Sequence, residues 1–201
     1  MNSMKIKPQK ILTSWIAVVF IAYVALAAFQ KFAIYPIEAL LLPVYAQYAS
    51  LMYLPHAVRV LATVIYGPKT FFVLLPAVLF EAYLLYPKTD GLFSITTIAI
   101  AVIGAACAPI AFLLLNKIGG VDVSGSDARN LRCNWRCVFA GGLIASAINS
   151  IGLTAFFFDL SDINTASLAM ARFFVGDIIG LLVGLVVLTF IFRLLRHIKA
   201  T

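Results

Sequence analysis

The stretch ARFFVGDIIGLLVGLVVLTFIFRLLR, residues 171–196, decides the class of fold. A helix that crosses the hydrocarbon core of a bilayer needs about 20 consecutive, mostly apolar residues, and residues 168–192 supply such a run. The run therefore predicts a transmembrane helix. Near its start it carries Arg172 and Asp177, although a charged side chain at the bilayer centre costs roughly 2.5–3.5 kcal/mol even on lenient insertion scales.

The composition of the whole chain agrees with a membrane location. Of its 201 residues, 63% are hydrophobic and only 11% are charged, whereas a soluble domain is about 45–50% apolar and about 25% charged. The first apolar run is long and no small-residue cleavage site follows it, so we interpret it as a retained anchor rather than a signal peptide. We predict one all-α integral membrane domain over residues 1–201, a polytopic helix bundle.

Six apolar runs are long enough, or nearly so, to be spans. We predict them at about 11–29, 52–67, 70–87, 92–116, 137–158 and 168–192. Pro36, Pro43 and Pro55 interrupt the region after the first span, and proline breaks helices. We therefore expect 34–51 to be a non-spanning apolar segment, re-entrant or interfacial, with Tyr35, Tyr45, Tyr48 and Tyr53 in an aromatic belt at headgroup level. The alternative treats 34–51 as a span of its own.

The placement of the basic residues predicts the orientation, because cytoplasmic loops carry excess Lys and Arg. Lys5, Lys7 and Lys10 precede the first span, basic residues follow the last, and the longest loop, 117–136, is basic as well. We therefore expect a bacterial inner-membrane protein with both termini in the cytoplasm. This topology also explains the net charge of +7, so no nucleic-acid partner is predicted.

Six polar residues lie inside the predicted spans. On this topology all six fall at the midplane of the bilayer or in its outer half. They are His56, Arg59, Glu81, Asn149, Arg172 and Asp177. Two cations match two anions, and buried ions are far less costly when paired. We expect the six to converge on an outward-facing polar pocket that binds a small ligand. The alternative is a set of structural ion pairs that fix the helix order, with the long arginines snorkelling to the headgroups.

Three glycines of the last span repeat at every fourth position: Gly176, Gly180 and Gly184. Small residues at this spacing let two helices approach closely. The strip predicts either a contact within the chain or a seam between copies.

Sequence motifs for chemistry are scarce. The chain has no HExxH motif, no phosphate-binding glycine loop and no Ser–His–Asp signature, so we predict that it is not an enzyme. The three cysteines, Cys107, Cys133 and Cys137, indicate neither a disulfide framework nor a metal site. The cofactor, if any, is unknown.

Four segments in order resemble the type-one MASE family of membrane-associated sensor domains. They are LPHAVRVLATVIYGPKTFFVLLPAVLF (54–80), TIAIAVIGAACAPIAFLLL (97–115), CVFAGGLIASAINSIG (137–152) and RFFVGDIIGLLV (172–183). The resemblance covers about 52–195, and Gly176-Asp177 with Gly180 is its most specific part. It implies a sensor domain at the N-terminus of histidine kinases or diguanylate cyclases.

Because this sequence stops at Thr201, a signal is expected to pass to a separate protein. We therefore expect a sensor-like binding module in contact with the lipid bilayer, a membrane or cytoplasmic protein and a small ligand from the outer side. One alternative is a small-solute transporter or the membrane substrate-binding subunit of an uptake system. Another is a structural subunit of a larger membrane complex.

Overall fold

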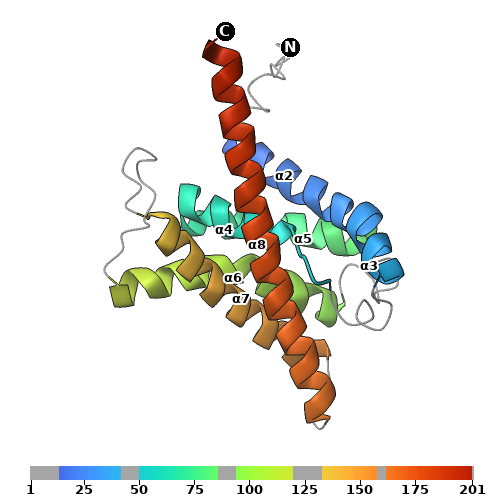
Figure 1. Cartoon of the computed structure of the whole chain (residues 1–201). Coiled ribbons are helices and arrows are strands. Elements are labelled where there is room, and N and C mark those ends of the chain that lie inside the picture. Colours follow the sequence, from blue (N-terminus) through green and yellow to red (C-terminus); the bar gives the residue numbers. More distant parts are fainter. Residues whose placement is uncertain (1–13, 42–49, 86–93, 120–132, 158–161, 201) are drawn as a thin grey trace, which may run out of the picture.

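A computed structural model of the chain describes residues 14–41, 50–85, 94–119, 133–157 and 162–200. Within these ranges all regular structure is helical, which confirms the predicted helical membrane bundle (Figure 1). The elements are α2 (Trp15–Phe29), η1 (Gln30–Ile34), α3 (Tyr35–Leu41), α4 (Pro55–Tyr66), η2 (Pro68–Thr70), α5 (Phe71–Leu85), α6 (Ile95–Gly119), α7 (Trp135–Phe157) and α8 (Ile163–Ala200).

Among the residues that the structure describes, four helices are long and apolar enough to cross a membrane: Trp15–Leu41, Ile95–Ile118, Trp135–Phe156 and Ile163–Ile198. The predicted count of six is not confirmed. The predicted second and third spans are α4 and α5, with 12 and 15 residues. At about 1.5 Å per residue they measure about 18 and 22 Å, short of the ~30 Å hydrocarbon core.

The first span is longer than predicted. Its helix does not stop at 29 but passes through the π-helical turn η1 into α3 and ends at Leu41. The Tyr35 N–H donates to the Gln30 carbonyl, five residues back, so the helix widens just before Pro36, which has no N–H to donate. Residues 42–49, with Pro43, Tyr45 and Tyr48, lie outside the described residues.

Helix α4 is short but central. It packs against α2, α6, α7 and α8, and eight of its residues are buried: Pro55, His56, Ala57, Arg59, Val60, Ala62, Thr63 and Val64. It begins with proline in its first turn, where no intrahelical donor is lost. It ends at Gly67, whose φ of 77° is a left-handed conformation that glycine adopts without a steric penalty. The chain turns there into η2 and α5.

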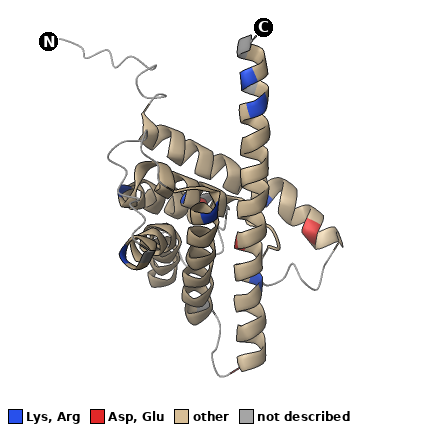
Figure 2. Cartoon of the chain, turned by 60° about the vertical axis from the view of Figure 1, so that its left-hand side comes forward, with Lys and Arg blue, Asp and Glu red and all other residues tan. Residues whose placement is uncertain are grey.

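Helix α8 is the longest element, with 38 residues. It crosses the other helices, and its C-terminal part projects beyond them (Figure 1). Side chains on that part are apolar and exposed, among them Val186, Val187, Phe190, Ile191 and Phe192. Charged residues are few on the helices, and basic ones gather near the end of α8 (Figure 2). An apolar, exposed surface of this kind suits contact with lipid.

The structure corrects the sequence prediction for two cysteines. Cys133 and Cys137 form a disulfide with their Cα atoms 5.2 Å apart, whereas no disulfide was predicted. The Cα separation lies within the usual ~4.4–6.8 Å range; Cys133 lies two residues before α7 and Cys137 lies in its first turn. Cys107 is a free, buried thiol.

Candidate functional site

All six polar residues predicted within spans are buried in the bundle. Their exposed fractions run from 0% for His56 to 6% for Arg172, so none of these side chains opens onto the surface in this structure. They come from four helices: His56 and Arg59 from α4, Glu81 from α5, Asn149 from α7, and Arg172 and Asp177 from α8. Five of them lie in two hydrogen-bonded clusters that meet at α4.

The first cluster joins Arg59 to Glu81 through two tyrosine hydroxyls. Arg59 Nη2 donates to the hydroxyl oxygens of Tyr23 and Tyr53, at 2.8 and 3.1 Å. The Tyr23 hydroxyl donates to Glu81 Oε2 at 2.6 Å, and the Tyr53 hydroxyl lies 3.1 Å from both carboxylate oxygens. The guanidinium carbon also lies 5.5 and 5.1 Å from the centres of the two tyrosine rings, a cation–π geometry.

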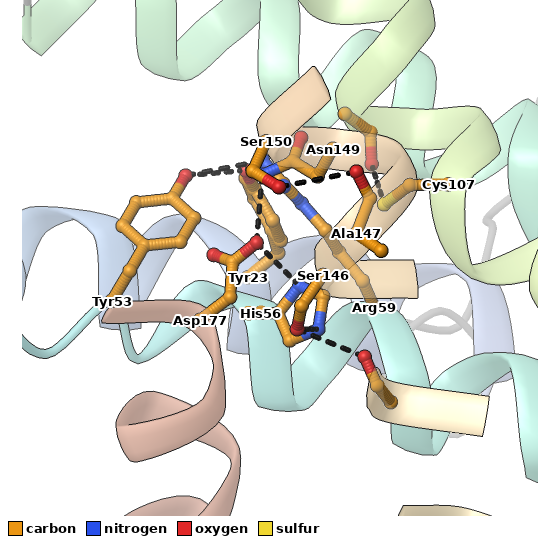
Figure 3. A network of polar contacts seen from close by, with 12 residues as sticks. Tyr23, Tyr53, His56, Arg59, Cys107, Ser146, Ala147, Asn149, Ser150 and Asp177 are labelled. Carbon is orange, nitrogen blue, oxygen red and sulfur yellow. Dashed lines mark hydrogen bonds and ion pairs between the residues drawn. The ribbon is translucent and has the colours of Figure 1, made fainter. Parts of the chain in front are cut away.

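The second cluster joins α8 to α7 and α4 at Asp177 (Figure 3). Asp177 Oδ2 accepts a hydrogen bond from Asn149 Nδ2 at 2.8 Å and lies 3.5 Å from His56 Nδ1. On the other side of the imidazole, His56 Nε2 and Ser146 Oγ are 3.2 Å apart. Ser146 Oγ in turn donates to the Gly142 carbonyl at 2.9 Å. Asp177 is therefore a polar link between α8 and the bundle.

Arg172 lies apart from Asp177 on α8. The two are five residues apart, which places them about 140° apart around the helix axis. Arg172 is instead one turn before Gly176, on the face that carries the glycine strip. It is 6% exposed, so its guanidinium does not snorkel out of the protein in this structure.

The glycine strip is a contact within the chain. A Cβ at Gly176 would overlap the carbonyl oxygen of Ser50, and one at Gly180 would overlap that of Tyr53. A Cβ at Gly184 would overlap the Cβ of Ala57. The Tyr53 N–H also donates to the Gly176 carbonyl at 2.9 Å. The strip thus brings α8 against residues 50–57, which places His56 and Tyr53 near Asp177.

A third polar group ties the π-helical turn to the same segment. Gln30 is fully buried, and its Nε2 donates to Ser50 Oγ at 2.7 Å. Gln30 Oε1 accepts from the Leu54 N–H at 3.2 Å, while Ser50 Oγ donates to Glu38 Oε1 at 2.9 Å. The widened turn of the first helix therefore holds the segment that leads into α4.

Four of these network residues were not predicted from the sequence: Tyr23, Gln30, Ser50 and Ser146. Tyr53 was predicted to lie in a headgroup belt, but its hydroxyl belongs to the first cluster. Among the described residues, no group of three or more His, Cys, Asp or Glu side chains could hold a metal ion. The site therefore consists of buried acidic and basic side chains that come from five helices.

The chain matches no known protein family, no curated protein and no solved structure at a significant level.

Proposed function

We propose that this protein is a sensor-like integral membrane module, in which α8 passes a change at the buried polar network to a partner protein. One observation carries the proposal. Helix α8 contributes Asp177 to the network and then continues unbroken to Ala200, beyond the other helices (Figure 1). A helix of this kind moves as a unit, so a shift where Asp177 binds is also a shift at its far end.

The attachment of α8 to the bundle also supports this function. The strip of Gly176, Gly180 and Gly184 offers no side chains that interlock with α4. Asp177 supplies a buried polar contact there, beside the hydrogen bond from the Tyr53 N–H to the Gly176 carbonyl. To transmit a signal, the ligand that binds the network must have different affinities for two arrangements of α8. The hydrogen bond of Asp177 to Asn149 and its 3.5 Å contact with His56 depend on its charge, which gives one source of such a difference. The resemblance of RFFVGDIIGLLV (172–183) to the MASE family supports the same assignment.

We place the module in a bacterial inner membrane with both termini in the cytoplasm. The indole of Trp15, at the start of α2, stacks on Tyr66 with ring centres 5.0 Å apart, and Lys69 Nζ lies 5.2 Å from the Trp15 ring centre. The start of the first span and the α4–α5 turn are therefore neighbours. This supports a common membrane face for Lys69 and the lysines before the first span, as the positive-inside rule requires.

The experiment measures whether α8 moves when the network changes. Nitroxide labels on Leu194→Cys and Ile118→Cys, at exposed ends of α8 and α6, report their distance in lipid nanodiscs by double electron–electron resonance. The three native cysteines are replaced first. We expect Asp177→Asn to shift the distance distribution or to add a second population.

The matched control is Thr189→Val, on the exposed part of α8, where the hydroxyl bonds only its own helix at Leu185. It should leave the distribution unchanged. If Asp177→Asn does not fold, Asn149→Ala tests the same link from α7. Folded variants with unchanged distances would refute the sensor assignment and favour a rigid structural subunit. Solute flux in proteoliposomes that Asp177→Asn abolishes would favour a transporter instead.

A further inference from the structure

Ser146, His56 and Asp177 form an enclosed chain of polar atoms across α7, α4 and α8. The distances are 3.2 Å from Ser146 Oγ to His56 Nε2 and 3.5 Å from His56 Nδ1 to Asp177 Oδ2. Exposed fractions are 0% for Ser146 and His56 and 2% for Asp177. In so enclosed a site, the position of each proton follows from which atoms donate and which accept.

The directions of the hydrogen bonds leave no proton between His56 Nδ1 and Asp177 Oδ2. Ser146 Oγ donates its only proton to the Gly142 carbonyl, so it accepts from His56 Nε2–H. With Nε2 protonated, a neutral imidazole presents the lone pair of Nδ1 to Asp177 Oδ2. If Asp177 were ionised as well, two acceptors would face each other at 3.5 Å. One further proton, on Nδ1 or on Oδ2, converts this repulsion into a bond.

The charges around Asp177 and His56 also indicate one additional proton. Arg59 on α4 is the cation of the network, while Glu81 on α5 and Asp177 on α8 are two carboxylates. The other groups that surround the pair are neutral: Tyr23 on α2, Tyr53 before α4, Cys107 on α6, and Ser146 and Asn149 on α7. One negative charge is therefore in excess, and an uncompensated charge is very costly inside a bundle.

Three more ions lie near the first helix: Lys31 in η1, Glu38 in α3 and Arg172 on α8. Glu38 accepts a hydrogen bond from Ser50, and none of the three is among the charged groups that act on Asp177 or His56. The excess is therefore counted for the buried network of Arg59, Glu81 and Asp177.

We propose that Asp177 and His56 bind one proton between Oδ2 and Nδ1, and that this proton fastens α8 to α4. The ligand of the buried site is then the hydrogen ion. Its release would leave a carboxylate facing an imidazole lone pair and would weaken the only polar contact of Asp177 with α4 among the described residues. The signalling meaning of this proton rests on the proposed function, whereas its presence is measured independently of any signal.

A catalytic role for the same three residues is the competing explanation. A serine hydrolase triad has the same order of atoms, from Ser Oγ to His Nε2 and from His Nδ1 to Asp. In such a triad, however, the serine donates to the histidine, which acts as the base. Here Ser146 donates to a helix carbonyl and is fully buried. The contacts therefore favour a proton-binding site over a nucleophile.

The chain has only two histidines, His56 and His197, which makes the site accessible to spectroscopy. Protein labelled with ¹⁵N-histidine in lipid nanodiscs gives two imidazole spin systems, and His197→Gln assigns them. At neutral pH we expect one of two signatures. Either the His56 ring is doubly protonated, or the infrared spectrum contains a protonated-carboxyl band.

Variants then locate the proton. Asp177→Asn should abolish either signature and leave His56 neutral with its proton on Nε2. Ser150→Ala is the matched control, since Ser150 is a buried serine of α7 that bonds its own helix at Ala147. It should change neither signature. If Asp177→Asn fails to fold, His56→Gln should abolish the imidazolium signature or shift the carboxyl band.

Three results would overturn the proposal. The first is a neutral His56 with no carboxyl band that depends on Asp177. The second is a carboxyl band that Glu81→Gln removes while Asp177→Asn does not. The third is covalent labelling of Ser146 by a fluorophosphonate probe, which would show a nucleophilic serine. A bound proton without movement of α8 would refute the sensor and keep the proton site, and movement without a bound proton would do the reverse.

Discussion

At the scale of single residues, the rarest groups in an apolar span were the ones that sequence could identify. Charged and amide side chains are costly in a bilayer, so Glu81, Asn149 and Asp177 drew attention by their presence alone. The hydroxyl residues that connect them, Tyr23 and Ser146, gave no such signal. Tyrosine and serine are tolerated in membrane helices, and their role depends on the side chain they face, which belongs to another helix.

Tyr23 is the residue on which the first cluster depends most directly. It is fully buried, accepts from Arg59 at 2.8 Å and donates to Glu81 at 2.6 Å. Tyr23→Phe keeps the ring and removes both hydrogen bonds. We expect a loss of about 1–3 kcal/mol in the free energy of unfolding, the usual cost of leaving buried polar partners unsatisfied. Denaturant titration in mild detergent, followed by tryptophan fluorescence, measures it.

The control for this change is Tyr83→Phe on α5, where the tyrosine is 58% exposed. It should stay within about 0.5 kcal/mol of the parent, as is usual for exposed positions. Equal losses from both variants would mean that the hydroxyl of Tyr23 contributes nothing particular to the bundle.

At the scale of elements, the sequence predicted where helices occur better than where they end. The turn at Gly67-Pro68 and the start of α4 at Pro55 follow from local rules for glycine and proline. The continuation of the first helix beyond residue 29 does not follow from local rules, because Pro36 predicts a break in the helix. The π-helical turn that precedes it depends on Gln30, whose amide is held by Ser50 and Leu54. Such a tertiary contact has no local pattern.

The contact between α8 and residues 50–57 gives a prediction at this scale. Replacing a helical glycine with alanine normally favours the helix by about 1 kcal/mol. At Gly180 the new Cβ would overlap the backbone carbonyl of Tyr53, which cannot rotate away. We therefore expect Gly180→Ala to lower the thermal stability of the purified protein and to loosen α8, seen as faster amide hydrogen exchange around Gly176.

Gly152 on α7 is the control, because a Cβ there meets the side chain of Ile103, at 2.8 Å, and its three nearest neighbours include no backbone atom. Gly152→Ala should therefore cost less stability than Gly180→Ala, since a side chain can shift where a backbone carbonyl cannot. If Gly180→Ala instead leaves the fold intact and changes only the oligomeric state, the strip is a seam between copies and the internal packing is not its main role.

At the scale of the whole molecule, the class of fold followed from composition, but the arrangement of the helices did not. Hydropathy reports that a segment avoids water and does not say which neighbour covers it. The central position of the short helix α4 illustrates this limit. Its polar residues His56 and Arg59 were predicted to line an outward-facing pocket, and in the structure four helices pack against α4.

Two features of the molecule predict opposite orientations in the membrane: the basic residues and the disulfide. The basic residues predict that the start of α7 faces the cytoplasm. The structure joins Cys133 to Cys137 there, and disulfides are rare in the cytoplasm. We expect the charge pattern to decide the topology. Both cysteines are half-buried rather than enclosed, so the pair can exist as thiols in a reducing cytoplasm without repacking the bundle.

Single cysteines at Ile163 and Ile118, which are 74% and 84% exposed, test this in intact bacterial cells, with the three native cysteines replaced. We expect a membrane-impermeant maleimide to label Ile163→Cys, at the start of α8, before lysis. Ile118→Cys, at the end of α6, should react only after permeabilisation. The reverse pattern would invert the topology, place Cys133 and Cys137 in an oxidising compartment where their disulfide persists, and turn the projecting end of α8 away from any cytoplasmic partner.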